Sequence, residues 1–294
     1  MGKALADAFP ICRETLAEAD EALGEPLTEL ILEGPEDRLT LTENAQPAIL
    51  AVSTAANRLL ESYGIQPAFV AGHSLGEYSA HVAAGTFSFC DAVRTVRRRG
   101  RYMQEAVPVG EGAMAAILGL DVDKVAQACL EAADGEVVAP ANLNGAGQVV
   151  IAGARDAVRR AGERARALGA RRVMPLPVSA PFHCALMKPA EERLAPELRA
   201  LRTRNPRIPV VANVDAEPKR DAAAAIEALV RQVSAPVRWK AIVERLASEG
   251  VTTYVEVGPG TALGGLVRKI HPDAIAVSFG SPDDLAAVES ALHV

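Results

Sequence analysis

The chain has 294 residues, of which 49% are hydrophobic and 23% charged, and its formal net charge at pH 7 is −6. This composition is typical of a globular protein with one large domain or two smaller ones. The negative charge argues against a nucleic-acid surface, and no apolar run has the length of a membrane span, so we expect neither partner. Because no signal-peptide pattern appears either, the expected location is the cytoplasm.

The cysteine pattern points away from disulfides and metal sites. The four cysteines, Cys12, Cys90, Cys129 and Cys184, are scattered and show no Cys-x-x-Cys spacing. A zinc site or a redox motif would show such spacing. We therefore expect buried free thiols in a reducing compartment.

The first quarter of the chain has helical periodicity. Helices are predicted at residues 1–23, 27–34 and 45–63. Thr40 and Glu43 have the spacing of a capping box just before the third helix. The start is unusual, because an α/β domain usually begins with a strand.

The next stretch carries the strongest functional signal. Residues 66–71 predict a short apolar strand, residues 75–84 a helix, and between them lies Gly72-x-Ser74-x-Gly76. This pattern is typical of a nucleophile elbow, a tight turn that exposes a serine Oγ at a helix N-terminus, where free N–H groups favour an oxyanion. We expect close packing to require both glycines. Ser74 is the predicted nucleophile.

A self-contained pattern follows. After an arginine-rich helix at residues 90–105, a Pro/Gly-rich stretch at residues 108–112 interrupts the chain. The predicted elements then come in the order strand, helix, strand, strand, helix, strand, at residues 113–120, 122–133, 136–142, 148–153, 155–168 and 171–175. This βαββαβ order is the ferredoxin-like unit, and its bounds suggest an inserted subdomain.

The remaining chain returns to alternating helices and strands. Helices are predicted at residues 189–201, 221–232, 239–249 and 263–270, and strands at residues 208–213, 252–257 and 274–277. The predicted fold class is α/β. We expect a discontinuous catalytic core at residues 1–111 and 177–294, with the ferredoxin-like subdomain at residues 112–176.

A nucleophilic serine needs a base within hydrogen-bond reach, and the chain has five histidines. His73 neighbours the serine, but the geometry of an elbow points its side chain elsewhere, and we expect His81 to pack or to face solvent. His271 and His293 lie in polar surroundings. His183 lies in an irregular apolar segment at the predicted subdomain junction, where a catalytic role and a buried structural role are equally open.

Several motifs, in the same order along the chain, resemble the malonyl-CoA:acyl carrier protein transacylase family. They are Gly72-His73-Ser74-Leu75-Gly76-Glu77-Tyr78, Pro181-Phe182-His183-Cys184-Ala185-Leu186-Met187, and residues 103–108, 112–116, 213–215, 229–232 and 256–260. The resemblance covers nearly the whole chain and implies an α/β-hydrolase-like core with a ferredoxin-like insertion. It also implies transfer of a malonyl group from malonyl-CoA to the thiol of acyl carrier protein, in fatty acid biosynthesis. We expect no tightly bound cofactor, no metal and a monomer.

The resemblance implies roles for individual residues. Ser74 would accept the acyl group, and His183 would be its base. The main-chain carbonyl of Gln232 would orient the histidine, although the pattern alone favours a surface position for Gln232. The Leu75 N–H would stabilise the oxyanion. Arg99 would pair with the malonyl carboxylate, because a guanidinium matches a carboxylate with two hydrogen bonds.

Three further residues would contact the substrate. Phe182 resembles the bulky residue associated with malonyl over methyl-branched acyl groups. Asn142 and Asn144 resemble the family's asparagine pair near the thioester arm, although turn residues need no function. The other arginines of helix 90–105 would be solvated or would contact the acidic carrier protein.

One departure from the family pattern concerns the start of the chain. The family normally begins with a strand and a Phe-Pro-Gly-Gln-Gly-Ser-Gln loop that supplies a second oxyanion donor, and this sequence begins downstream of it. Losing one such donor typically costs ~10²–10³ in rate. We therefore expect either a truncated chain or a stable but impaired variant, whose activity rises when that segment is restored.

Three alternatives stay open. A trans-acting acyltransferase of a polyketide pathway would use the same chemistry with another carrier. A serine esterase or thioesterase would need an acid to orient its histidine, and Asp215 with His271 have the right chain order. A degenerate domain would bind the carrier without transferring an acyl group.

Overall fold

The computed structural model describes residues 1–178 and 180–293. Its first part is helical, with α1 (Lys3–Ala8), α2 (Pro10–Leu23), α3 (Leu27–Glu33), α4 (Glu36–Leu39) and α5 (Thr42–Ser62). The prediction of one helix over residues 1–23 is wrong. The chain is extended at Phe9, and α2 restarts at Pro10, because proline has no N–H to donate to the preceding turn.

The predicted capping box before α5 is also wrong. The N-cap residue of α5 is Leu41, and no side chain caps this helix. The Thr40 hydroxyl instead donates to the main-chain oxygen of Asp37, at 3.1 Å. A local polar contact has replaced the expected one.

The larger part of the molecule contains five short strands among its described residues. The strand β1 (Val70–Ala71) pairs in parallel with β6 (Val210–Val211), and β6 pairs antiparallel with β7 (Pro218–Lys219). A separate parallel pair contains β8 (Thr253–Val257) and β9 (Ile275–Phe279). The strands predicted at residues 66–71 and 208–213 thus shrink to two residues each, because a strand extends only as far as its partner pairs with it.

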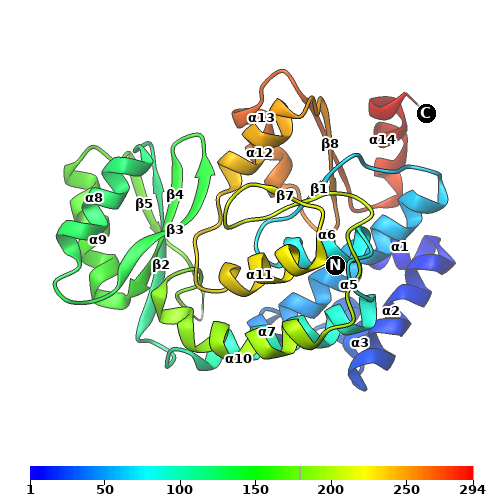
Figure 1. Ribbon diagram of the computed structural model, residues 1–294, viewed down its shortest axis with the longest axis horizontal. Helices are drawn as coiled ribbons and strands as arrows, with labels where there is room; N and C mark the ends of the chain where they lie inside the picture. The colour runs from blue at the N-terminus through cyan, green and yellow to red at the C-terminus, as the bar shows by residue number, and fades with distance from the viewer. Residues whose placement is uncertain (179, 294) are drawn as a thin grey trace.

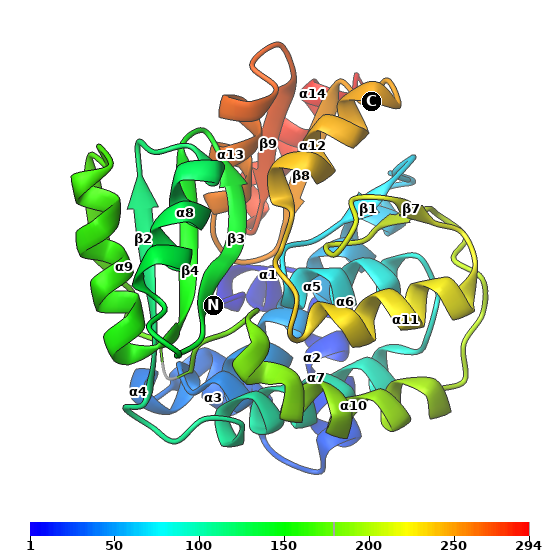
Figure 2. The same cartoon turned by 60° about the vertical axis from the view of Figure 1, so that its left-hand side comes forward.

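Helices surround these strands (Figures 1 and 2). They are α6 (Leu75–Ala83), α7 (Phe89–Glu105), α10 (Lys188–Ala200), α11 (Ala222–Gln232), α12 (Trp239–Ser248), α13 (Ala262–Ile270) and α14 (Leu285–Leu292). The main hydrophobic core lies between α2, α5, α7, α10 and α11 and includes Leu50, Val93 and Leu194. The helices α4 and α14 and the strand β7 were not predicted.

The part seen on the left of Figure 1 contains β2 (Gly112–Leu118), α8 (Val122–Ala132), β3 (Val138–Gly145), β4 (Gln148–Ala154), α9 (Arg155–Ala167) and β5 (Arg172–Pro175). These elements follow the predicted βαββαβ order. Their strands form one antiparallel sheet in the order β3-β4-β2-β5.

Successive side chains of β2 and β4 point to opposite faces of the sheet, and both faces are buried. Ile117 and Ile151 point to one face and pack with α8 and α9. Met114 and Val150 point to the other face and pack against Cys184, in the segment that follows β5. The second face therefore holds in place the segment that carries His183.

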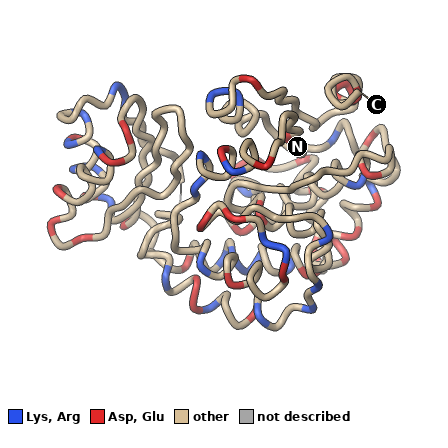
Figure 3. Tube along the Cα trace, turned by 45° about the horizontal axis from the view of Figure 1, so that its top comes forward, with Lys and Arg blue, Asp and Glu red and all other residues tan. Residues whose placement is uncertain are grey.

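Charged residues of both signs occur in both parts of the molecule (Figure 3). Many form surface ion pairs, such as Arg160 with Glu136 and Arg199 with Glu227. The net charge of −6 is therefore spread over a surface of mixed sign. Within residues 1–178 and 180–293, none of the helices combines the length and the hydrophobicity that crossing a bilayer requires.

Candidate active site

Ser74 lies at the turn between β1 and α6, as the elbow pattern predicts. Its backbone has φ 54° and ψ −108°, a conformation that L residues seldom adopt. A Cβ at Gly72 would lie 2.0 Å from the main-chain carbon of Gly76, so this glycine is required. The same expectation for Gly76 is wrong, because a Cβ there would meet no atom within 4 Å.

Asn213 holds this strained turn in place. Its side chain is fully buried just after β6, the parallel neighbour of β1. Its Oδ1 accepts a hydrogen bond from the Ser74 N–H at 2.7 Å, and its Nδ2 donates to the Gly72 carbonyl at 2.7 Å. Sequence reasoning missed this role, although a polar residue at the end of a predicted apolar strand was a usable signal.

Ser74 and His183 have the relative positions of a catalytic serine–histidine dyad. The Ser74 Oγ lies 2.7 Å from His183 Nε2, and His183 Nδ1 lies 3.0 Å from the Gln232 main-chain oxygen. Because a carbonyl oxygen can only accept, Nδ1 carries the proton and Nε2 is left to accept the serine proton. Burial, together with the nearby Arg99 cation, lowers the pKa of His183 to about 3. The imidazole is therefore neutral at pH 7, and its Nε2 carries no proton.

The orienting residue Gln232 ends α11 and is fully buried, so the surface position favoured by its pattern is wrong. Leu75 is the first residue of α6. Its N–H has no partner within the helix, because the first turn of a helix lacks acceptors for its N–H groups. This N–H lies next to Ser74 in the chain and is free of the helical hydrogen-bond ladder.

Arg99 reaches the serine from α7. Only 2% of the residue is exposed, and its Nη2 donates to Ser74 Oγ at 3.1 Å and to Gln232 Oε1 at 2.9 Å. Its Nη1 donates to Gln46 Oε1 at 2.6 Å. The guanidinium also lies over the Tyr78 ring, 5.3 Å from its centre. Two neutral amide oxygens thus hold a buried cation beside the Ser74 hydroxyl. Gln46 was not predicted, because nothing in its helical context distinguishes it from other polar residues.

The two asparagines lie in β3, not in a turn, because this strand extends to Gly145. Asn144 is buried, and its Oδ1 contacts His73 Nε2 at 3.0 Å. Burial lowers the pKa of His73, against the effect of this hydrogen bond. The buried Oδ1 of Asn142 has no hydrogen-bond partner among the described residues. Phe182 is half-buried between the main core and the inner face of the subdomain sheet.

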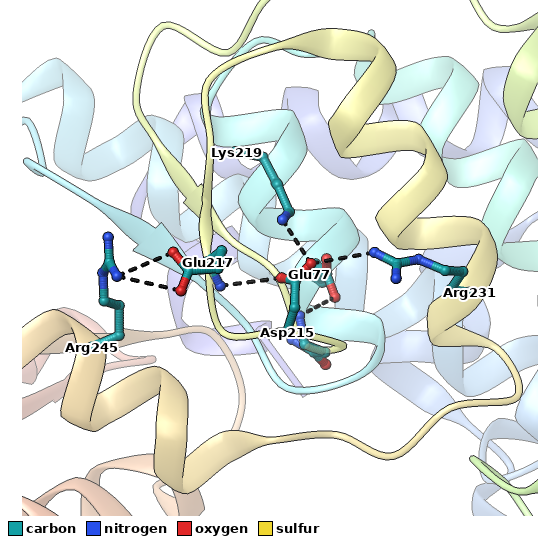
Figure 4. A network of polar contacts seen from close by, with 7 residues as sticks. Glu77, Asp215, Glu217, Lys219, Arg231 and Arg245 are labelled. Atoms are coloured by element: carbon teal, nitrogen blue, oxygen red, sulfur yellow. Dashed lines mark hydrogen bonds and ion pairs between the residues drawn. The ribbon is translucent and has the colours of Figure 1, made fainter.

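The alternative acid–histidine pair is not formed. Asp215 contacts Lys219 at 2.8 Å and Arg231 at 3.3 Å (Figure 4). His271 contacts the Tyr254 hydroxyl through Nδ1, at 3.1 Å. The four cysteines are free; three are buried, as expected, whereas Cys90 is half-buried.

His81 packs in the core and takes no part in the site. It is fully buried; its Nδ1 contacts Thr86 Oγ1 at 3.0 Å, and its Nε2 has no partner among the described residues. Burial lowers the pKa of His81 to about 3.

This low pKa makes stability depend on pH. Between its ordinary pKa of 6.5 and its folded pKa, the unfolded chain binds a proton that the folded protein does not. His81 therefore lowers the free energy of unfolding by about 2 kcal/mol between pH 7 and pH 5. We expect a His81→Gln variant to lose less stability over this range in urea titrations. The prediction would be contradicted if the free energy of unfolding, relative to each protein's own value at pH 8, fell equally in the wild type and in His81→Gln.

The geometry defines a class of protein. A serine on a strand-to-helix turn, a neutral histidine oriented by a carbonyl and a buried arginine at the hydroxyl belong to a serine-dependent enzyme that handles acyl groups. Residues 1–273 match the family described as "Acyl transferase domain".

This chain is similar to the following three proteins over almost their whole length. The malonyl CoA-acyl carrier protein transacylase of Escherichia coli strain K12 is 51% identical over 284 residues, which cover 96% of this chain and 92% of that protein. An acyl carrier protein S-malonyltransferase from Vibrio cholerae has a TM-score of 0.96 and 47% identity, covering 98% of this chain and 94% of that one. A malonyl-transacylase solved with a type II PKS acyl-carrier protein has a TM-score of 0.95 and 47% identity, covering 99% and 93%. The chain belongs to the malonyl CoA-acyl carrier protein transacylase family.

Proposed function

We propose that this protein transfers a malonyl group from malonyl-CoA to the phosphopantetheine thiol of acyl carrier protein, in fatty acid biosynthesis. The observation that carries the proposal is the buried Arg99 guanidinium, 3.1 Å from the Oγ of Ser74. An acyl group bound to this serine lies beside a cation, and a carboxylate at its far end pairs with that cation. A neutral acyl group would leave the cation without a charged partner.

The first half-reaction follows from the hydrogen bonds. His183 Nε2 takes the proton of the Ser74 hydroxyl as Oγ attacks the thioester carbonyl of malonyl-CoA. The developing oxyanion accepts a hydrogen bond from the Leu75 N–H at the start of α6. When the intermediate collapses, the C–S bond breaks, and the CoA thiolate receives the proton from His183. The products are free CoA and a malonyl ester of Ser74.

The second half-reaction runs in the opposite direction. His183 accepts the proton of the carrier thiol, the sulfur attacks the ester carbonyl, and Ser74 leaves and recovers a proton from His183. A carbonyl oxygen stabilises an imidazolium less than a carboxylate does. The weaker stabilisation is sufficient in the first half-reaction, where the leaving CoA thiolate departs with less help from an acid than an amine does.

We further propose the domain division at residues 1–111 and 177–294 for the core, and 112–176 for the subdomain. The separate sheet of β2–β5 and its own hydrophobic cluster support this division. The site draws Ser74 and His183 from the core, whereas Asn142 and Asn144 come from the subdomain. We propose that these asparagines and Phe182 line the path of the substrate arm. We also propose that the protein is a cytoplasmic monomer without a tightly bound cofactor.

A second candidate differs only in the carrier. The similarity to a malonyl-transacylase solved with a type II PKS acyl-carrier protein favours a polyketide carrier as an alternative acceptor. The same experiment tests both. The purified protein is incubated with radiolabelled malonyl-CoA and a fatty-acid or a polyketide carrier, and malonyl-carrier and free CoA are measured. We expect faster transfer to the fatty-acid carrier.

The other outcomes are distinct. CoA release at the same rate with and without a carrier, with no labelled carrier, would identify a thioesterase instead. Carrier binding without any label on the protein or the carrier would identify a docking domain.

A further inference from the structure

Glu77 is a fully buried carboxylate next to the site that the mechanism above does not use. It lies in the first turn of α6, three residues after Ser74. Its Oε2 accepts hydrogen bonds from Gln232 Nε2 at 2.7 Å and from the Asn213 N–H at 3.1 Å, and its Oε1 has no partner among the described residues. Figure 4 shows Glu77 beside Asp215, which pairs with Lys219 and Arg231. Burying such a group is costly, so its position calls for an explanation.

The contacts of Glu77 give the Gln232 side-chain amide a single orientation. Gln232 Nε2 donates to Glu77 Oε2 and also to the Ser74 main-chain oxygen, at 2.8 Å. Burial raises the pKa of Glu77 to about 7, but Oε2 also faces the Asn213 N–H, so a proton on this carboxyl lies on Oε1 and Oε2 remains an acceptor. The Ser74 carbonyl can only accept, so a flipped amide would place its own oxygen against two acceptors. The carboxylate and the carbonyl together hold the NH₂ on their side, and the Gln232 Oε1 must point the other way.

That oxygen points at Arg99. Gln232 Oε1 accepts from the Arg99 Nη2, the same atom that reaches Ser74 Oγ. Glu77 acts on the guanidinium through a neutral amide. A carboxylate bound directly to Arg99 would neutralise the charge that an incoming carboxylate needs, whereas an amide oxygen positions the cation and leaves its charge available.

We infer that Glu77 is a positioning residue for acyl-group selectivity: it fixes the Gln232 amide, which holds the Arg99 guanidinium against the acylated Ser74. This inference rests on the proposed function and adds to it a residue that positions Arg99, which sets the preference for carboxylated acyl groups. The property that matters is an acceptor oxygen at the position of Glu77 Oε2, not the negative charge.

Two variants distinguish the effect of the acceptor oxygen of Glu77 from the effect of its negative charge. Glu77→Met keeps the approximate volume and removes the acceptor, and Glu77→Gln keeps an acceptor oxygen and removes the charge. In Glu77→Met we expect kcat/KM for malonyl-CoA to fall about 10–100-fold, the size of effect seen when a residue that orients a metal ligand by a hydrogen bond is removed. For acetyl-CoA, whose acyl group has no carboxylate, the change should be much smaller, so the malonyl-to-acetyl ratio falls. In Glu77→Gln the ratio should stay near the wild-type value.

A matched control removes another carboxylate that accepts two hydrogen bonds. Glu256 in β8 accepts from the N–H groups of Leu263 and Gly264 at the start of α13. Glu256→Met should leave the malonyl-to-acetyl ratio unchanged. Gln232→Met keeps the main-chain carbonyl for His183 and should reproduce the selectivity loss. The double variant with Glu77→Met should lose no more than Gln232→Met alone.

Each outcome decides a different point. If the wild type makes no malonyl-carrier, the proposed function fails. If the wild type transfers malonyl but Glu77→Met loses both substrates in equal proportion, the function stands and this inference is overturned. Equal selectivity losses in Glu77→Gln and Glu77→Met would overturn the acceptor role. If Glu77→Met does not fold, Gln232→Met provides the test, and an unchanged ratio in that variant overturns the inference.

Discussion

Replacing Ser74 by alanine should remove malonyl transfer almost completely. Without Oγ, no ester can form, and His183 has no proton to accept from residue 74. Losses of a nucleophile in comparable serine enzymes suggest a decrease in kcat of at least about 10⁴-fold. Because alanine keeps the Cβ, the unusual backbone at this position, with φ 54°, is not strained further.

The measurement traces label from radiolabelled malonyl-CoA to the protein and then to its proteolytic peptides. In the wild type, the label should lie on the peptide that contains Ser74. Ser79→Ala is a suitable control, because it removes a buried hydroxyl from the same helix, one that has no hydrogen-bond partner among the described residues. Wild-type labelling in Ser74→Ala would refute the assignment of the nucleophile.

Replacing Arg99 by methionine should remove the preference for a carboxylated acyl group. In the proposed function the buried guanidinium provides the charge that pairs with the malonyl carboxylate. Removing one partner of a buried charge pair costs roughly 3–5 kcal/mol, which corresponds to a loss of about 10³-fold in kcat/KM for malonyl-CoA. Acetyl-CoA has no carboxylate to lose a partner, so its kcat/KM should change far less.

Acyl-enzyme formation from the two CoA thioesters measures this ratio without the carrier protein. Arg98→Met provides the control, because Arg98 is half-exposed and pairs with Glu197 at 2.6 Å. Exposed pairs contribute about 0–1 kcal/mol, so both rates should stay near those of the wild type. Equal losses for malonyl and acetyl groups in Arg99→Met would show that Arg99 has a structural role only.

The local parts of the site could be predicted because the neighbouring residues along the chain determine them. The elbow needs a strand, a glycine, a serine and a helix within about ten residues, so the pattern around Ser74 was sufficient. The βαββαβ order of β2 to β5 was predicted for the same reason, since hydrophobic periodicity within each segment indicates its type. The break at Pro10 was also a local signal, and it was overlooked.

The long-range parts could not be derived from pattern alone. His183 was one of five histidines, and the reading of its segment left its role open. Its role, like those of Gln232 and Arg99, came from a family resemblance, and the pattern of Gln232 pointed to the surface. The contacts of Asn213, Gln46 and Glu77 were not foreseen at all. Each of these contacts joins segments that lie far apart in sequence.

The sequence by itself predicted Ser74 as the nucleophile, its strained turn and the βαββαβ order of the subdomain, because these depend on steric and hydrophobic patterns within short segments. Only the tertiary structure decided which histidine reaches Ser74, which carbonyl orients it and which amides hold Arg99. Those contacts depend on how β1 pairs with β6 and on how α7 and α11 pack against α6. A buried polar side chain reveals its partner only when that packing is known.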